Sequence, residues 1–403
     1  MISLGEAILK NVAIIPAGTL PLPPVCGGAV ENLVDLLRKY NTPDNEVKLT
    51  FFSIYDSKAK QVAQENENTR YIFVRIPVVI RWFDWLLFWV VTNIFRKGKN
   101  MSYRYIFQRV YYIGWVSYYL KRHQFDRVVL ENHATLLWII RLFNNTKKYA
   151  GKYYYHMHNT IPNFYHCQEI FEKAAAIIGV SLYILTTLPS DVQSHVKTVV
   201  LKNRVDESQF KLQLSHETEH NLRQQFRLGN KKVVLFTGRF SPEKGIKQLL
   251  QAWAILKPTN AVLLIVGGAY FKSDIKTKFE EEMAKLATQM ADSVRVTGFI
   301  DYQKIPLLYA LADLVVLPSM WDDPAPLTII EALTAEKRLI TTYSGGIPEY
   351  TNSTTIVLKR DKDLIANLCS SIKESLSSSV PLQHNDWHFI DYYEQFLEIL
   401  GLK

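Results

Sequence analysis

Cysteine is scarce in this sequence. The chain of 403 residues contains three cysteines, Cys26, Cys167 and Cys369, which stand far apart without a CxxC pair. This spacing supports neither a zinc ribbon nor a disulfide framework. Because an odd, sparse set of cysteines is typical of a reducing compartment, we expect a cytoplasmic protein.

A long uninterrupted apolar run is also missing. Within the most apolar stretch, residues 71–95, Arg75, Arg81 and Asp84 interrupt the pattern. A helix that spans a bilayer needs about 20 mostly apolar residues, so this stretch does not predict a transmembrane segment. Near the start of the chain, Glu6 breaks the apolar residues, which argues against a secretory signal.

The composition is that of a folded, moderately basic protein. Apolar residues make up 48% of the chain and charged residues 21%, which excludes a disordered chain. There are 47 lysines and arginines against 38 aspartates and glutamates, a net charge of +9. At roughly 100–200 residues per domain, the length predicts two or three domains.

Short apolar runs alternate with longer amphipathic stretches along the whole chain. Uninterrupted apolar strands in such alternation predict an α/β fold, with parallel sheets that helices cover on both faces. We expect helices over residues 29–40, 103–122, 246–256 and 305–312. The expected strands are residues 12–16, 48–54, 71–76, 127–130, 153–156, 182–186, 233–236, 261–266, 294–297, 314–317, 339–342 and 355–358.

The chain changes character between residues 202 and 231, which are polar, before Val233 opens a fresh series of strands. We therefore expect two Rossmann-like doubly wound domains that face a cleft, where a ligand binds at the carboxyl ends of the strands. The expected domains are residues 1–205 and 206–380. Apolar residues at helical spacing near the end predict a last helix within 381–403, packed back on the first domain.

The most informative stretch follows the strand expected at 233–236. Gly238 lets the backbone turn closely past a ligand, and Arg239 and Lys244 follow on a loop before an amphipathic helix. A forked guanidinium and a point-charge ammonium near a helix N-terminus suit a diphosphate. The alternative is an ordinary solvated loop with two basic residues.

A second stretch pairs two acids around a helix start. Asp323 lies in a proline-rich loop, and Glu331 follows eight residues later inside the expected helix. A carboxylate that accepts two hydroxyl hydrogen bonds suits a ribose or a hexose. In the alternative interpretation Asp323 caps the helix and Glu331 belongs to a buried ion pair. Gly345 and Gly346 form a third, weaker signal between a strand and a helix.

In this order and spacing, the sequence resembles the retaining nucleotide-sugar glycosyltransferases of family 4, which have the GT-B fold. The resemblance is dense over residues 200–350 and thinner before residue 150. The matching pieces are Gly27-Gly28 with Glu31, His158-Asn159, Asn203-Arg204-Val205-Asp206 with Phe210, Gly238-Arg239 with Lys244, Gly298-Phe299, Leu308-Tyr309, Ala312-Asp313, Pro318-Ser319, the E-x7-E position at 323 and 331, and Gly345-Gly346.

The sequence departs from the family pattern at three places. The first acid of E-x7-E is Asp323 rather than glutamate, and Pro326 stands where the family has glycine. Glu336 and Arg338 replace the usual glycine and proline after the helix. The changes at Asp323 and Pro326 concern the expected contacts to the donor sugar, and those at Glu336 and Arg338 concern a surface loop.

The resemblance implies that residues 1–205 bind the acceptor and residues 206–380 bind a nucleotide sugar, and it implies the roles of individual residues. Arg239 and Lys244 neutralise the leaving diphosphate without a metal or other cofactor, Glu331 holds the ribose, and Asp323 holds the transferred sugar. His158 lies near the sugar and the acceptor. The implied catalytic residues are Arg239, Lys244, Asp323 and His158, and the implied donor-binding residues are Gly27, Gly28, Gly238, Arg239, Lys244, Phe299, Asp323, Pro324, Ala325, Pro326, Leu327 and Glu331.

Residues 85–125 contain no aspartate or glutamate but carry seven lysines and arginines next to several aromatic residues. Apolar bulk beside basic charge is what contact with an anionic membrane requires, so we expect peripheral binding at the inner face of the cell membrane. The alternative is a domain core with a solvated rim. Nucleic-acid binding is disfavoured, because no matching motif is present.

These observations predict an enzyme, a hexosyltransferase. It would move a hexose-type sugar from a nucleotide diphosphate sugar, a UDP-sugar by family frequency, to a saccharide acceptor. Family habit suggests a lipid-linked acceptor and polysaccharide biosynthesis. Two alternatives remain: a nucleotide-sugar epimerase of the same architecture, and a catalytically decayed subunit that binds a sugar or a partner.

Overall fold

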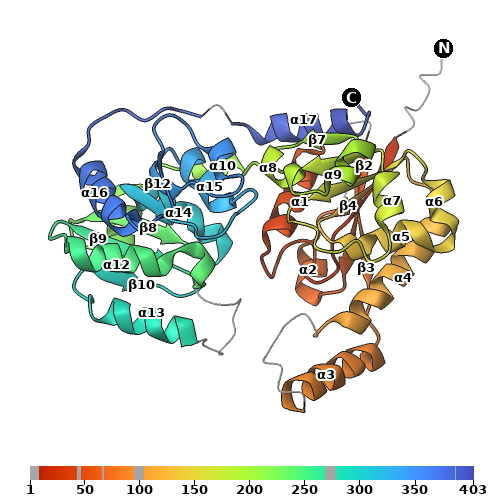
Figure 1. Cartoon of the computed structure of the whole chain (residues 1–403), viewed down its shortest axis with the longest axis horizontal. Coiled ribbons are helices and arrows are strands. Elements are labelled where there is room, and N and C mark those ends of the chain that lie inside the picture. The colour runs from red at the N-terminus through yellow and green to blue at the C-terminus, as the bar shows by residue number, and fades with distance from the viewer. Residues whose placement is uncertain (1–8, 43–46, 66–67, 95–103, 268–277, 386) are drawn as a thin grey trace. The chain divides into compact units, whose positions relative to one another are not determined.

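The computed structural model describes residues 9–42, 47–65, 68–94, 104–267, 278–385 and 387–403. The chain divides into two units (Figure 1). The first contains residues 1–202 and 393–403, and the second contains residues 203–392. None of the helices in the described ranges is long and apolar enough to cross a bilayer.

The described strands of the first unit form one parallel sheet in the order β3-β2-β1-β4-β5-β6-β7. Its strands are β1 Lys10–Ile15, β2 Val47–Ile54, β3 Thr69–Val74, β4 Arg127–Glu131, β5 Tyr153–Met157, β6 Ala176–Gly179 and β7 Thr198–Val200. Its helices are α1 Ala29–Tyr40, α2 Ser57–Val62, α3 Val78–Asn93, α4 Ile106–Arg122, α5 Leu137–Arg141, α6 Asn145–Lys148, α7 Gln168–Glu172, α8 Leu182–Thr186 and α9 Ser190–His195.

The second unit repeats this plan with a parallel sheet in the order β10-β9-β8-β11-β12-β13. Its strands are β8 Lys232–Thr237, β9 Ala261–Val266, β10 Val294–Val296, β11 Leu314–Leu317, β12 Arg338–Thr342 and β13 Ile356–Leu358. Its helices are α10 Glu207–Phe210, α11 His216–Gln225, α12 Ile246–Leu256, α13 Lys278–Thr288, α14 Ile305–Leu311, α15 Leu327–Thr334 and α16 Leu364–Ser377.

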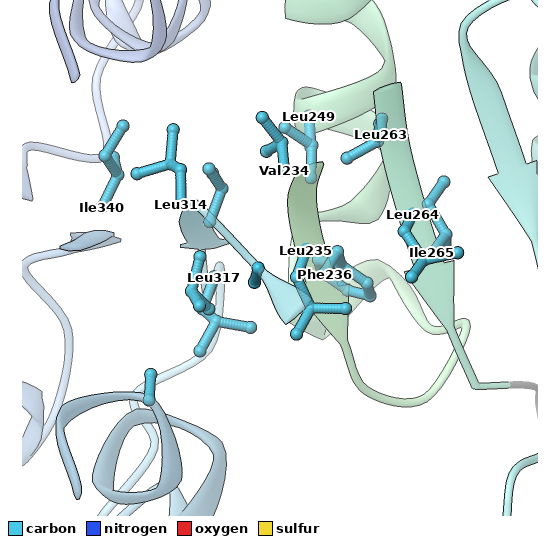
Figure 2. Packing of buried hydrophobic residues seen from close by; sticks show 14 of the residues in the cluster. Val234, Leu235, Phe236, Leu249, Leu263, Leu264, Ile265, Leu314, Leu317 and Ile340 are labelled. Atoms are coloured by element: carbon cyan, nitrogen blue, oxygen red, sulfur yellow. The ribbon is translucent and has the colours of Figure 1, made fainter. Parts of the chain in front are cut away.

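Helices cover both faces of the second sheet. Helix α12 packs against both α13 and α16, and α10, α14 and α15 form a second group. Right-handed crossovers place these groups on opposite faces, because the strand order reverses between β8 and β11. Figure 2 shows the core that results: Leu235 and Phe236 of β8 lie beside Leu264 and Ile265 of β9, and all four are buried. Both sheets therefore confirm the expected α/β class with two doubly wound, parallel domains.

The last helix, α17 Phe389–Ile399, carries the chain back to the first unit. There Tyr393 donates a hydrogen bond to the buried Asn41 side chain at 2.7 Å. The hydroxyl of Tyr154 and the guanidinium of Arg127 both donate to the carbonyl of Leu400. The expected return of a C-terminal helix to the first domain is confirmed.

One expected strand was wrong. Residues 182–186 form helix α8, because the Ser181 hydroxyl accepts a hydrogen bond from the Ile184 backbone and so caps a helix. The strand lies just before it, at β6, and β7 was not foreseen either. The other expected strands are confirmed to within two residues at each end, as are the helices at 29–40, 246–256 and 305–312. Residue 103 of the helix expected at 103–122 lies outside the described residues, and α4 confirms the rest from Ile106.

Candidate functional site

The second unit brings the predicted donor residues to one edge of its sheet. In a doubly wound sheet, ligands bind at the carboxyl ends of the strands where the strand order reverses, which here is between β8 and β11. The loop with Gly238, Arg239 and Lys244 follows β8, and the loop with Asp323 follows β11. The topology alone therefore explains why segments some 80 residues apart in sequence meet.

Glycines hold these loops in direct contact. A Cβ on Gly245, whose φ is +72°, would lie 1.8 Å from the Pro318 carbonyl oxygen. A Cβ on Gly345 would lie 2.5 Å from the Asp322 carbonyl carbon, and the Gly346 amide donates to the Asp323 carbonyl at 2.9 Å. Any larger residue at 245 or 345 would push the loops after β8, β11 and β12 apart.

Lys244 and Asp323 form the ion pair at this edge. Lys244 Nζ lies 2.7 Å from Asp323 Oδ2, and the ammonium also lies 5.8 Å from the centre of the Trp321 ring. Asp323 is buried, and its other oxygen faces the Ala325 amide at 3.4 Å. A small pocket opens beside the pair, lined by residues of three loops and α15: Phe236, Thr237, Lys244, Leu317, Ser319, Asp323, Pro326, Thr328, Ile329 and Ile347.

Arg239 lies on the same loop but has a different partner. Its guanidinium is about half exposed and lies 3.7 Å from the Glu243 carboxylate. A pair this long and this exposed contributes little energy, so the guanidinium can turn toward an anion at small cost. The backbone carbonyl of Glu243 accepts from the Met320 amide at 2.8 Å, which ties this loop to the one after β11.

Glu331 is buried inside α15 and accepts two tyrosine hydrogen bonds. Tyr302 and Tyr309 donate to its carboxylate at 2.9 and 3.0 Å. Burial raises the pKa of Glu331 to about 7, and the two hydroxyls hold it from rising further. Tyr309 also bonds the Thr237 hydroxyl at 2.8 Å, and Thr237 directly precedes Gly238. The carboxylate is thereby tied to the end of β8.

These contacts differ from both alternative interpretations of the two acids. The residue that precedes α15 is Pro326, so Asp323 is not its cap. Glu331 bonds two neutral hydroxyls, and no described cation pairs with it.

The remaining donor residues predicted in this unit surround the same edge. Gly238 donates its amide to the Val266 carbonyl, and a Cβ on Gly267 would lie 1.9 Å from the Gly238 oxygen. Gly267 in turn donates to Gly298, so the loop that carries the half-exposed Phe299 is held next to that of Gly238. Pro324, Ala325, Pro326 and Leu327 form the turn from Asp323 into α15.

In the first unit, His158 lies at the carboxyl edge of the sheet and belongs to a buried cluster. Glu131 Oε2 lies 3.0 Å from His156 Nδ1 and 2.9 Å from His158 Nε2. Burial, and then the neighbouring His156, lowers the pKa of His158 to about 4. His158 is therefore neutral at pH 7, with Nε2 donating to Glu131. Glu131, His156 and His158 are also a group whose ligand atoms lie close enough to hold a metal ion.

The Gly27-Gly28 turn lies beside this cluster. Gly28 has φ +112°, and a Cβ there would lie 2.2 Å from Glu31 Oε2, so only glycine fits against this carboxyl. Burial raises the pKa of Glu31 to about 7, and the nearby Glu131 adds to the rise. Gly27, Gly28 and His158 therefore gather at one edge of the first sheet.

Two residues that contact the predicted site residues were not identified from the sequence: Glu131, which contacts His158, and Tyr302, which contacts Glu331. Glu131 ends a strand at the carboxyl edge, a position that could have marked it. The hydroxyl of Tyr302 had no sequence signal, because its approach to Glu331 depends on how α10, α14 and α15 pack.

Comparison with known proteins finds similarity to glycosyltransferases. Residues 218–378 match the family model of the glycosyl transferases group 1. The chain is 26% identical over 227 residues to the lipopolysaccharide 1,2-N-acetylglucosaminetransferase of Salmonella typhimurium, which covers 55% of this chain and 56% of that protein. It is 25% identical over 353 residues to spore coat protein SA of Bacillus subtilis, and the match covers 84% of this chain and 82% of that protein.

Solved structures resemble the chain along nearly its whole length. The crystal structure of Anabaena Alr3699/HepE in complex with UDP-glucose has a TM-score of 0.67 at 18% identity and covers 97% of this chain and 99% of that one. At this identity the likeness concerns the fold. The chain thus has the two-domain GT-B fold, and residues 218–378 of its second unit are similar to the group 1 glycosyl transferases.

Proposed function

We propose that this protein is a retaining hexosyltransferase. It would transfer a sugar from a UDP-sugar to a lipid-linked saccharide in polysaccharide biosynthesis. The observation that carries the proposal is the pairing of Lys244 with Asp323, beside the buried Glu331, where the strand order of the second sheet reverses. UDP-glucose bound to HepE, a neighbour in fold, supports the choice of donor.

In this proposal Lys244 and Arg239 bind the diphosphate. A lysine ammonium has three donors, so Lys244 can keep Asp323 and still donate to a phosphate oxygen. The two cations then stabilise the negative charge that develops on the leaving diphosphate, which a metal ion does in other enzymes. Metal independence is part of the proposal.

The two carboxylates bind the sugars of the donor. Glu331 accepts hydrogen bonds from the ribose hydroxyls, and Asp323 accepts from the hydroxyls of the transferred sugar. Phe299 and the turn from Pro324 to Leu327 complete the donor site.

Transfer with retention is a same-face displacement. The bond from the anomeric carbon to the diphosphate oxygen breaks, and the bond to the acceptor oxygen forms on the same side of the ring. The acceptor proton passes to the leaving phosphate oxygen, so the step needs no further reactant.

The assay that tests the proposal incubates the protein with a panel of UDP-sugars and saccharide acceptors. We expect free UDP and a glycosylated product with the α or β configuration of the donor, at a rate that EDTA leaves unchanged. Interconversion of donor sugars without transfer would indicate an epimerase instead. Loss of activity in EDTA, restored by a divalent cation, would contradict metal independence.

Helix α3 supports peripheral contact with a membrane. Its tryptophans Trp82, Trp85 and Trp89 recur at three- and four-residue spacing on one face, and each is 46–58% exposed. The buried Asp84 points the other way, where both its oxygens accept from the backbone of α4 at 2.8 and 2.9 Å. In Figure 1, α3 lies beyond α4, away from the strands of its unit.

The charge around this helix fits an anionic lipid surface. Arg75, Arg81 and Arg104 are exposed, and Asp84 is the single acid among residues 75–125. Tryptophan and arginine together favour the interface between water and lipid. Residues 95–103, with Arg96, Lys97 and Lys99, lie outside the described residues. We propose a cytoplasmic protein held on the inner face of the cell membrane by α3.

Replacing Trp82, Trp85 and Trp89 together by serine should lower binding to phosphatidylglycerol vesicles at least about tenfold, because these rings supply the inserted apolar area. Sedimentation with vesicles measures it. A matched control replaces Leu182, Ile255 and Val380, which are 60–67% exposed on other elements, by serine. Equal binding of the two triple variants would contradict a specific role of α3.

A further inference from the structure

Arg109 is a half-buried cation that lacks a carboxylate partner. It lies in the first turns of α4, and its Nη1 atom lies 2.6 Å from His133 Nε2. Its Nε atom is buried without a hydrogen-bond partner, and no carboxylate in the described ranges pairs with the guanidinium. A buried charge that nothing neutralises is costly, and it is uncommon away from ligand sites.

His133 does not neutralise this charge. Burial, and then the positive charge of Arg109, lowers the pKa of His133 to about 4, so the ring is neutral at pH 7. Arginine can only donate, and Nε2 therefore accepts. Nδ1 lies 2.8 Å from the Thr135 hydroxyl and 3.3 Å from the Thr135 backbone nitrogen, so the ring is also held by the turn that follows it. The histidine thus orients the guanidinium while the charge remains available.

Asp84, the last acid before Arg109 in the sequence, is fully used elsewhere. Both oxygens of Asp84 accept from the backbone amides of Phe107 and Gln108 at the start of α4. This contact joins α3 to α4 just before Arg109. The unpaired cation therefore lies two residues from the point where α3, the proposed membrane element, is attached.

Arg109 also lies where the strand order of the first sheet reverses, between β1 and β4. His133 follows β4 directly, and Gln108 donates to the carbonyl of Gly18 in the loop after β1, at 3.4 Å. Tyr165, from the loop after β5, stacks on the His133 ring with 6.3 Å between ring centres. The carboxyl edge at a reversal of strand order is where such sheets bind ligands.

We propose that Arg109, oriented by His133 and flanked by Tyr165, binds the phosphate that links the acceptor saccharide to its lipid. A guanidinium suits this role, because its fork can donate two parallel hydrogen bonds to phosphate oxygens. The assignment to the acceptor rests on the proposed transferase function. It places the phosphate of the acceptor beside α3 and leaves the donor to the second unit.

The test measures binding of geranyl phosphate to the full-length protein by calorimetry, with geraniol and inorganic phosphate as comparison ligands. We expect geranyl phosphate to bind most tightly and Arg109→Gln to weaken it roughly 10- to 100-fold, the factor for a charged hydrogen-bonded pair. Arg109→Lys should retain part of the affinity, because it keeps the charge and loses the fork. Arg70→Gln, which changes an exposed arginine on β3 of the same unit, is the matched control.

The outcomes separate this proposal from that of the donor site. UDP should bind Arg109→Gln as tightly as the parent, and this variant should melt no lower, because it removes an uncompensated charge. Unchanged affinity of both Arg109 variants for geranyl phosphate would overturn the proposal. Equal binding of geraniol, or of inorganic phosphate, would also overturn it, by showing that the tail alone or free phosphate is recognised. If the parent protein itself does not bind UDP, this result counts against the proposed donor site and not against the role of Arg109.

Discussion

Replacing Lys244 by alanine should lower kcat about 10²–10³-fold, the loss typical of removing one preorganised group that stabilises developing charge. The variant loses the ammonium that lies 2.7 Å from Asp323 and leaves this buried carboxylate without its cation. Because the charge on the diphosphate is greatest in the transition state, kcat should fall more than KM rises. Steady-state rates of UDP release measure both constants.

Lys247→Ala is the matched control for this experiment. Lys247 is a half-exposed lysine three residues further along, in the first turn of α12, and it pairs with Glu282 of α13 at 2.9 Å rather than with an acid of the proposed donor site. Its loss should change kcat less than about twofold, because an exposed ion pair contributes under about 1 kcal/mol. Equal effects of the two substitutions would show that the diphosphate lies elsewhere.

Glu331→Gln should weaken UDP binding roughly 10- to 100-fold, because hydrogen bonds to a charged acceptor contribute about 1.5–3 kcal/mol. Glutamine keeps the volume of the side chain and can still accept from Tyr302 or Tyr309, so the fold should survive. Titration calorimetry with UDP measures the loss, and a melting curve checks the fold. If Glu331→Gln binds UDP with an affinity within about twofold of the parent, Glu331 does not bind the ribose.

The same residue predicts how binding depends on pH. The pKa of Glu331 is raised to about 7, and ribose hydroxyls bind its ionised form. UDP affinity should therefore rise roughly tenfold between about pH 6 and about pH 8, and Glu331→Gln should abolish this rise. Glu31, whose pKa is also raised to about 7, lies in the first unit, and Glu31→Gln should leave the rise intact.

The stability of the folded chain should change with pH in the direction opposite to the affinity for UDP. Each of these buried carboxyls binds its proton more tightly in the folded than in the unfolded chain. Their contribution to stability is therefore full below about pH 4.5 and falls as the pH rises to about 7. The ligand-free protein should lose this part of its stability over the range in which UDP binding improves.

Much of the donor site could be predicted because its residues lie in local patterns. Gly238, Lys244 and Asp323 each follow a strand that is plainly apolar in sequence, and parallel strands bring their carboxyl ends to one edge. The positions of β6 and α8 were harder to predict. Strand β6 has only four residues, and helix α8 is an apolar run of five that includes the strand-favouring Tyr183 and Ile184, so the Ser181 cap decided where the helix begins.

Long-range contacts account for what the sequence could not show. Tyr302 and Tyr309 reach Glu331 from the turn before α14 and from α14 itself, which packs against α15, and the glutamate between His156 and His158 lies on the neighbouring strand β4. In the sequence, nothing distinguishes Arg109 from the other basic residues of segment 85–125. Its isolation from carboxylates appears only once Asp84 is seen bonded to the start of α4.

The most direct test of the central claim is a crystal structure of the full chain with UDP. The diphosphate should lie within hydrogen-bond distance of Lys244 Nζ, and the ribose hydroxyls should contact the Glu331 carboxylate. A nucleotide bound anywhere other than the carboxyl ends of β8 and β11, with Lys244 still paired to Asp323 alone, would contradict the account.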